Sequence, residues 1–299
     1  MTRAYVPLVV TLSLLWGASY LFIKVGDREI EPATMMLARV LVAGVVLCGY
    51  LAVRGELGEL RRAPVAAYTL GILNGALPFT LIAWGEKHVD SGVAAIANST
   101  VPIFVTLLAL RFRPSERATG LRLFGVLLGL LGVGVLAGVH PGGGWWGAAG
   151  TAAITLASVS YGVSILWGQT LIERTSGPVL ATAAVIGAAI VLLPFGLVQA
   201  PHHVPSWKPV ASVAALAFLG TAAAQLVWFR LLRGHGSARS SLVNYLLPPT
   251  ALLYGVTLLG EPLTAEELIG LVLVLAGVAL GSGAVRIVRR QPAPVTPGP

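Results

Sequence analysis

Charged residues are scarce in this chain: they make up 11% of its 299 residues, against 56% for hydrophobic ones. A soluble domain usually carries about 25% charged residues, and a chain this apolar could not cover itself with polar surface in water. In a soluble protein the net charge of +8 would suggest nucleic acid. Here the basic residues form short clusters between apolar runs, so we expect a lipid bilayer as the partner and no nucleic acid.

Cysteine is almost absent, since Cys48 is the only one. An intrachain disulfide and a cysteine-based metal site are therefore excluded. The sequence also lacks HExxH, GxSxG and paired carboxylates within its apolar runs, which are the patterns that metal-dependent or nucleophilic hydrolysis would need. We expect no catalytic residue, no metal site and no cofactor, and hence no enzyme.

The chain is rich in apolar segments of about 20 residues, the length at which a helix crosses a hydrocarbon core of about 30 Å. Three predicted helices start at a proline, and Thr264 with Glu267 is typical of a capping box that opens the last helix. The predicted fold is an all-α membrane protein with ten transmembrane helices, at about residues 4–24, 33–53, 65–86, 90–111, 118–139, 147–170, 178–199, 207–232, 237–259 and 264–285.

The 20 Lys and Arg residues divide unevenly between the two sides that ten spans define. Fifteen fall on the side of both termini, four fall on the other side, and only Arg39 lies within a span. Basic residues stay on the cytoplasmic side. We therefore predict a multi-pass protein of a bacterial cell membrane with both termini in the cytoplasm, where the tail 287–299 is expected to be disordered.

The two halves of the sequence echo each other at a nearly constant offset. Asn98 and Pro102 match Asn244 and Pro248 at an offset of 146 residues. Trp16 matches Tyr161 at an offset of 145, and several Gly and Glu residues match at the same offset. A register kept over several residue types predicts a duplicated unit of five helices.

The predicted repeats are residues 1–140 and 141–286. Because five is an odd number, the second repeat enters the bilayer upside down relative to the first. Two inverted five-helix repeats around a central cavity can open to either side of the membrane, which is the geometry of alternating access.

The residues resemble the EamA-type transporters of the drug/metabolite transporter superfamily. The resemblance lies in three segments, LLWGASYLFIK, RPSERATGLRLFGVLLGLLGVGVL and LLGEPLTAEELIGLVLVLAGV, and covers about residues 5–285. It departs from the family at residues 114–116, which read PSE where the family usually has a Gly–Glu turn. The resemblance implies a ten-helix bundle that transports small metabolites, often by exporting amino acids or related amphiphilic solutes.

A proline within a helix leaves the carbonyl four residues earlier without its donor. For Pro102 this carbonyl belongs to Asn98, and for Pro248 and Pro249 it belongs to Asn244 and Tyr245. We therefore expect helix breaks or gates at the three prolines, and solute contacts at the residues whose carbonyls they free. The alternative is that each Asn bonds a neighbouring helix.

Other polar or amphipathic residues stand deep within predicted spans, where they prefer a partner or water to lipid. Trp16 and Tyr161 are expected to line the cavity, with packing between helices as the alternative. The remaining candidates for solute binding are Tyr20, Asn74 and Gln225.

Two charged residues are candidates for a charge contact. Arg39 lies about 10 Å below the outer surface at 1.5 Å per residue. There it attracts a solute carboxylate, snorkels outward, or pairs with Glu86, Asp90 or an acid of the first loop. Glu86, at the end of the third span, is the nearest candidate for proton coupling. Facilitated diffusion is slightly favoured, because no titratable group lies clearly inside a span.

We therefore predict a transporter of small-molecule solutes. A flippase of lipid headgroups is the closest alternative, an intramembrane enzyme is less favoured, and a receptor would need a longer soluble segment. GxxxG patterns at Gly125–Gly129, Gly134–Gly138 and Gly277–Gly281 predict close helix contacts. We favour contacts within the bundle, although a homodimer is an open alternative.

Overall fold

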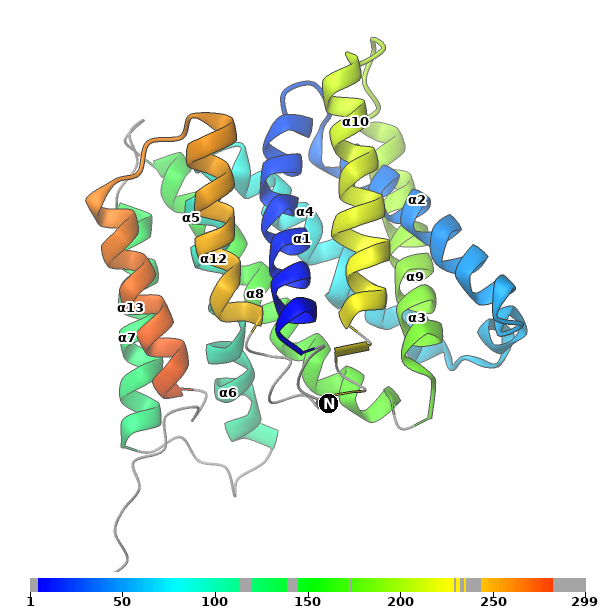
Figure 1. The fold of residues 1–299 in the computed structure, drawn as a ribbon, viewed down its shortest axis with the longest axis horizontal. Coiled ribbons are helices and arrows are strands. Elements are labelled where there is room, and N and C mark those ends of the chain that lie inside the picture. Colours follow the sequence, from blue (N-terminus) through cyan, green and yellow to red (C-terminus); the bar gives the residue numbers. More distant parts are fainter. Residues whose placement is uncertain are drawn as a thin grey trace, which may run out of the picture.

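The computed structural model describes residues 5–112, 120–138, 145–172, 174–228, 230–231, 234 and 243–281, and every regular element among them is helical. The predicted tail 287–299 lies outside these residues. The elements, drawn in Figure 1, are α1 (Tyr5–Gly26), α2 (Pro32–Val53), η2 (Leu57–Arg62), α3 (Val65–Gly71), η3 (Ile72–Ala76), α4 (Leu77–Glu86), α5 (Ser91–Asn98), α6 (Val101–Phe112), α7 (Leu121–Gly138), α8 (Trp145–Ile172), α9 (Gly177–Val198), α10 (Trp207–Ala215), η5 (Leu216–Ala223), α12 (Val243–Tyr254), η6 (Gly255–Leu259) and α13 (Ala265–Gly281).

Seven continuous helices are long and apolar enough to cross a membrane, counted over the described residues. Some join elements, such as α3, η3 and α4 in the helix 65–86. Two shorter apolar helices, Leu123–Leu136 and Val243–Leu259, accompany them. The all-helical membrane class is therefore confirmed, while the number of ten spans stays a prediction.

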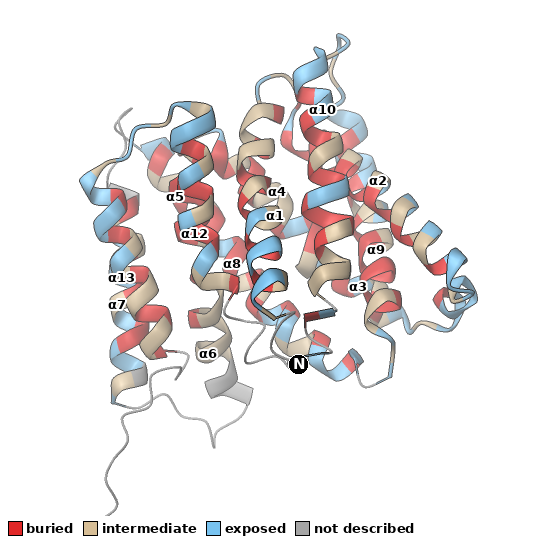
Figure 2. Cartoon of the chain, in the orientation of Figure 1, coloured by how far each residue is buried: buried red, intermediate tan, exposed pale blue. Residues whose placement is uncertain are grey.

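Large apolar side chains lie exposed along helices that also have a buried face (Figure 2). Val45, Ile190, Leu197 and Val272 are examples, each more than half exposed. In water these side chains would form a costly apolar surface, whereas hydrocarbon solvates them. The exposed faces are thus suited to lipid.

Glycines join α7 and α13, which lie side by side at one edge of the bundle (Figure 1). A Cβ atom added at Gly277 would lie 2.4 Å from the backbone nitrogen of Gly129, and one added at Gly125 would lie 2.4 Å from that of Gly281. Only residues without a side chain let two backbones approach this closely. The patterns Gly125–Gly129 and Gly277–Gly281 therefore form their contacts within the chain, as favoured from the sequence. The close contact predicted for Gly134–Gly138 is not found at Gly134, where an added Cβ atom would have nothing within 4 Å.

Helix starts follow the local signals in the sequence. Pro32 opens α2, Pro64 directly precedes α3, and Pro178 is the second residue of α9. At α13 the capping box is formed in both directions. The backbone N–H of Glu267 donates to Thr264 Oγ1 at 3.2 Å, and the N–H of Thr264 donates to Glu267 Oε2 at 3.1 Å.

Replacing Thr264 with alanine is expected to lower the free energy of unfolding by about 1 kcal/mol, because the N–H of Glu267 loses its acceptor. Denaturant titration of the purified protein in detergent micelles measures this change. Thr170→Ala is the matched control, since Thr170 is exposed and bonds only the carbonyl of Trp167 in its own helix. Equal losses in the two variants would contradict the capping role.

The loops 27–31, 87–90, 199–206 and 260–264 lie at one end of the bundle, opposite the N-terminus (Figure 1). The distribution of Lys and Arg predicts that this end faces away from the cytoplasm. We call it the outer end, and the end at which α1 begins the inner end.

Candidate functional site

A chain of polar side chains crosses the middle of the bundle. The Nδ2 amide of Asn98 donates to the hydroxyl of Tyr20 at 2.8 Å, and the Oγ hydroxyl of Ser158 donates toward Asn98 Oδ1 at 3.2 Å. These residues belong to α5, α1 and α8, so the chain joins three helices. Two of the predicted solute contacts, Asn98 and Tyr20, are therefore direct neighbours.

The helix that contains Asn98 is interrupted directly after it. A turn at Ser99 and Thr100 separates α5 from α6, which begins one residue before Pro102. Ser158 Oγ lies 3.3 Å from the carbonyl oxygen of Asn98, which is the acceptor that Pro102 leaves without a donor. The one hydrogen of this hydroxyl is shared with Asn98 Oδ1 and the carbonyls of Ala97 and Ile154, so a neighbouring helix supplies a partial replacement for the bond that the break removes.

The matching residues of the second half, Asn244 and Pro248, lie in a helix that is not interrupted. No helix break occurs at Pro248 or Pro249, because α12 continues through both prolines. Asn244 is partly exposed and has no hydrogen bond with another described residue, and Tyr245 packs at the edge of the main apolar core. Prolines are tolerated within membrane helices when packing against neighbours holds the helix, and here α12 packs on α1 and α5.

Arg39 is buried in the bundle with only 5% of its surface exposed. Its Nε donates to Thr221 Oγ1 at 2.8 Å, and its guanidinium carbon lies 3.7 Å from the centre of the Phe79 ring. The alternative that Arg39 snorkels to the surface is therefore wrong. The alternative of an ion pair with Glu86, Asp90 or an acid of the first loop is also wrong, since Arg39 has no ion pair within the described chain.

Asn74 and Gln225 line one small cavity beside Arg39. The Arg39 contacts Phe79 and Thr221 line it too. The volume of this cavity is about 10 Å³, which holds about one water molecule. The structure thus gathers two of the predicted polar residues at one point, around a cavity too small for anything larger than water. We call this point, with Arg39, the central site.

The segment that holds Asn74 is π-helical, and the following proline explains why. Pro78 has no N–H, so it cannot donate to the carbonyl of Asn74 as an α-helix would require. The preceding N–H, that of Leu77, donates to the carbonyl of Ile72, five residues earlier, and not to that of Leu73. The carbonyl of Leu73 accepts the hydroxyl of Ser160 of α8 at 2.9 Å. The lost α-helical bond is replaced by a contact between helices.

Two further candidates flank these residues. Trp16 packs against Trp228, with ring centroids 5.6 Å apart, and is partly buried. Tyr161 packs at the edge of the main core, and its neutral phenol lies in the neighbourhood of Arg39 without a hydrogen bond to it. Trp16 therefore meets an aromatic neighbour in this structure, while Tyr161 borders the central site.

Sequence reasoning missed Thr221, Phe79 and Ser158, which contact the predicted residues directly. Threonine and serine commonly bond a carbonyl of their own helix, and phenylalanine is ordinary in a membrane span. No sequence signal distinguishes these three from neutral neighbours.

A larger cavity of about 410 Å³ opens at the inner end. Its charged lining consists of Arg54, Glu56, Glu59, Arg62, Arg174 and Arg230. Two of the arginines pair with the two glutamates, Arg54 with Glu56 at 2.8 Å and Arg62 with Glu59 at 2.9 Å. The inner cavity therefore carries net positive charge.

The inner cavity and the central site follow the same three helices. Tyr50 and Val40, both of α2, line the inner cavity and the small central cavity respectively. Leu226 lines the inner cavity, and Gln225, its neighbour in the chain, lines the central one. The two cavities are therefore separate but lie along the same three helices, α2, α9 and the helix 207–228.

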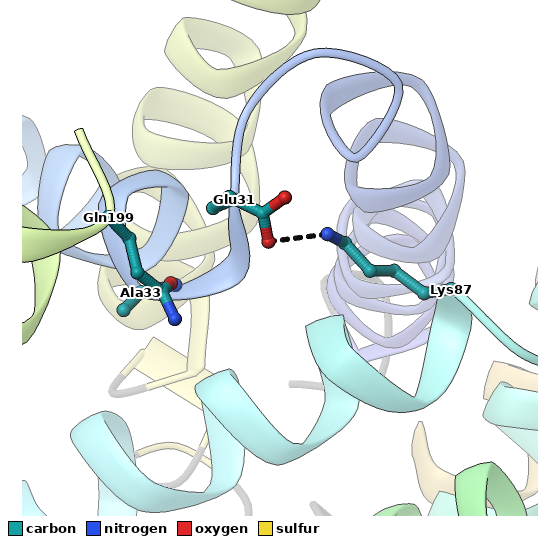
Figure 3. A network of polar contacts seen from close by, with 4 residues as sticks. All are labelled: Glu31, Ala33, Lys87 and Gln199. Atoms are coloured by element: carbon teal, nitrogen blue, oxygen red, sulfur yellow. Dashed lines mark hydrogen bonds and ion pairs between the residues drawn. The ribbon is translucent and has the colours of Figure 1, made fainter. Parts of the chain in front are cut away.

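At the outer end, polar contacts tie separate helices together. Lys24 donates from Nζ to the backbone carbonyls of Glu86 and Val89, both at 2.6 Å. Lys87 pairs with Glu31 at 2.5 Å, as Figure 3 shows. These contacts link the end of α1 and the start of α2 to the end of α4.

Further contacts of this kind bridge residues far apart in the sequence. Ser206 donates to Glu29 from its backbone N–H and its hydroxyl, both at 2.6 Å. The hydroxyl of Ser91 donates to Glu261 at 2.5 Å. The N–H of Ala33 donates to Gln199 Oε1 at 2.9 Å, beside the Lys87 pair in Figure 3. Among the described residues, the loops of the outer end are thus held together by polar contacts, whereas a cavity opens at the inner end.

Comparisons with known proteins identify relatives over nearly the whole chain. The model of the EamA-like transporter family matches twice, over residues 3–138 and 148–283. A protein of known crystal structure, 20% identical, superposes with a TM-score of 0.67 over 95% of this chain and 98% of its own. That likeness shows the fold.

Three curated relatives are similar in sequence. The "Uncharacterized inner membrane transporter YedA" of Escherichia coli (strain K12) is 28% identical, with 90% of this chain and 87% of the relative covered. A "Probable terminal-alkyne amino-acid exporter" of Streptantibioticus cattleyicolor is 30% identical, with 94% and 93% covered. A "Probable amino-acid metabolite efflux pump" of Salmonella typhimurium is 25% identical, with 94% and 96% covered.

Proposed function

Because the chain belongs to the EamA-like transporter family, we propose that it exports amino acids or related small amphiphilic solutes by alternating access. It is a multi-pass transporter of the cell membrane and not an enzyme. The amino-acid part of the proposal is supported by the two relatives that are named as an amino-acid exporter and an amino-acid metabolite efflux pump.

The proposed architecture is ten membrane helices in two inverted repeats, residues 1–140 and 141–286. The constant sequence offset and the two separate matches of the family model support this division. An even number of spans places both termini on one side, and the many basic residues there favour the cytoplasm. Rocking of one repeat against the other would expose the central site to either side in turn.

The observation that carries the proposed solute class is the buried guanidinium of Arg39. A charge at this depth is costly without a partner, yet Arg39 contacts a hydroxyl and an aromatic ring and forms no ion pair within the described chain, and the buried carboxyl of Glu86 acts on it only from a longer distance. A solute carboxylate would complete the site, because guanidinium binds carboxylate in a two-pronged geometry.

The other central residues suit the rest of such a solute. Asn74 and Gln225 offer amide donors and acceptors beside Arg39. Asn98 and Tyr20 lie on the neighbouring polar chain, and Tyr161 offers an aromatic face to an apolar side chain. Solute would enter from the open inner cavity and leave once the outer contacts separate.

Flux assays in liposomes test the proposal. Purified protein is reconstituted, and the efflux of radiolabelled large neutral amino acids is compared with that of their carboxamides, which lack the carboxylate. We expect transport of the acids to exceed that of the amides by about 10-fold or more, since one charged hydrogen-bond pair contributes about 1.5–3 kcal/mol. Protein-free liposomes give the background.

Equal flux of acids and amides, or no flux of either by folded protein, would refute the amino-acid proposal. The arginines of the inner cavity favour a second candidate, a flippase for anionic lipid headgroups. The same liposomes with a fluorescent anionic lipid test it, by the access of a quencher to the label on the opposite leaflet.

A further inference from the structure

Two carboxyl groups at the outer end are buried without any hydrogen-bond partner. All four carboxyl oxygens of Asp27 and Glu86 are inaccessible to solvent and unbonded, and no other side-chain nitrogen or oxygen of the described residues is in this state. Glu86 is the last residue of α4 and has 0% of its surface exposed, and Asp27 directly follows α1. Asp27 and Glu86 are thus two neighbouring acids at the outer end whose carboxyl groups are both buried without a hydrogen bond.

The cations nearby do not resolve this anomaly. The ammonium group of Lys24 donates hydrogen bonds to two backbone carbonyls, and Lys87 forms an ion pair with Glu31. Neither lysine forms an ion pair with Asp27 or Glu86. The charged and titratable groups that act on the two carboxyls are Tyr20, Lys24, Glu31, Arg39, Lys87 and Glu261, together with the influence of Asp27 on Glu86.

An ionised carboxylate in this position would lack both water and a donor, which is among the costliest states of a side chain. A bound proton removes the charge and leaves only a neutral group to bury. Burial raises the pKa of Asp27 from its ordinary value of 3.8 to about 8, against the opposing influence of Lys87 and Lys24. A metal cation is disfavoured, because two ammonium groups lie beside the carboxyls.

We propose that Asp27 and Glu86 form a proton-binding site of the closed outer end, which holds protons while the outer loops are together and releases them when the outer end opens. Opening exposes the carboxyls to water, where they ionise at neutral pH. Closure and proton uptake are then one linked equilibrium. The proposal does not depend on the identity of the solute.

The direction of the linkage follows from Asp27. Its pKa is about 8 in the closed state and about 4 when hydrated, so between about pH 4 and about pH 8 the closed state binds more protons than the open one. A rise in outer pH through this window shifts the equilibrium toward the open state, by at most 10-fold per pH unit for each proton. Acid outside the cell keeps the outer end closed.

The experiment measures the opening of the outer end directly. Cys48, the only cysteine, is replaced with serine, and a cysteine is introduced at Val89, which is 3% exposed at the outer end. A membrane-impermeant maleimide added outside then labels position 89 only when the outer end opens. A cysteine at Val204, which is 93% exposed, reports the pH dependence of the thiol chemistry itself.

The quantity compared is the labelling rate at position 89 divided by that at position 204. We expect this ratio to rise at least 10-fold between about pH 5 and about pH 8 and then to level off. The double variant Asp27→Asn and Glu86→Gln keeps both groups neutral, so its ratio should be low and independent of pH. Glu266→Gln, which changes an exposed acid of the outer end that is not among the groups acting on the two carboxyls, should keep the slope.

Two results would overturn the proposal. One is a labelling ratio that does not change with pH in the protein that retains Asp27 and Glu86, and the other is a ratio that still rises with pH in the double variant. If the double variant does not fold, infrared spectra of the wild-type protein decide. A band of protonated carboxyl that disappears as the pH is raised supports the site, and its absence at about pH 6 refutes it. No solute is present in these measurements, so failure of the export proposal leaves them unaffected.

Discussion

Replacing Gly277 with valine is expected to disrupt the packing of α13 on α7. The first atom of any side chain at this position would lie 2.4 Å from the backbone nitrogen and 2.5 Å from the Cα atom of Gly129. A backbone cannot move aside as a side chain can, so the two helices must separate. We expect a loss of about 3 kcal/mol or more in the free energy of unfolding, measured by thermal or denaturant unfolding in micelles.

Gly134→Ala is the matched control on α7. Nothing lies within 4 Å of a Cβ atom added at Gly134, and alanine favours the helix by about 1 kcal/mol. Its stability should therefore be unchanged or slightly increased. If Gly277→Val were as stable as this control, the close contact between α7 and α13 would not exist.

Arg39→Gln is expected to reduce the transport of amino acids selectively. Loss of a charged contact to a solute carboxylate should lower the transport rate at low solute concentration by about 30-fold to 100-fold, which corresponds to about 2–3 kcal/mol. Transport of the matching carboxamides should change little, because glutamine can still bond a neutral amide. Flux in liposomes gives both rates from one preparation.

Two further variants separate a carboxylate contact from a general effect of charge. Arg39→Lys keeps the charge but loses the planar fork, so we expect an intermediate rate. Arg28→Gln removes an exposed arginine of the outer loop and should leave both rates unchanged. An equal loss for acids and amides in Arg39→Gln would show that Arg39 serves the bundle and does not bind the solute.

The sequence predicted the all-helical membrane class because hydrophobic length is a local property. Every predicted start at Pro32, Pro64, Pro178 and Thr264 was found, since proline and the capping box act within one helical turn. The helix break expected at the double proline 248–249 is absent for the converse reason, while a gating role there stays a prediction. Whether a helix survives a missing hydrogen bond depends on its neighbours, and α12 has them in α1 and α5.

The central residues show the same limit. Asn74, Gln225 and Arg39 stood out because polar groups are rare in an apolar span, and the structure places them around one point. Their partners did not stand out. Thr221 differs from other threonines only by the helix that faces it, and this pairing of helices is not encoded in a single sequence pattern.

The hydrogen bonds and the ion pair at the outer end affect how fast this end can open. When Lys87 leaves Glu31, or Ser206 leaves Glu29, each group finds water at once, so a broken contact loses only about 0.5–1.5 kcal/mol. An apolar seal of the same extent would expose hydrocarbon to solvent on every cycle. In the proposed alternating-access cycle, hydrogen bonds that water can replace let the outer end open often, so its opening need not limit the rate of turnover.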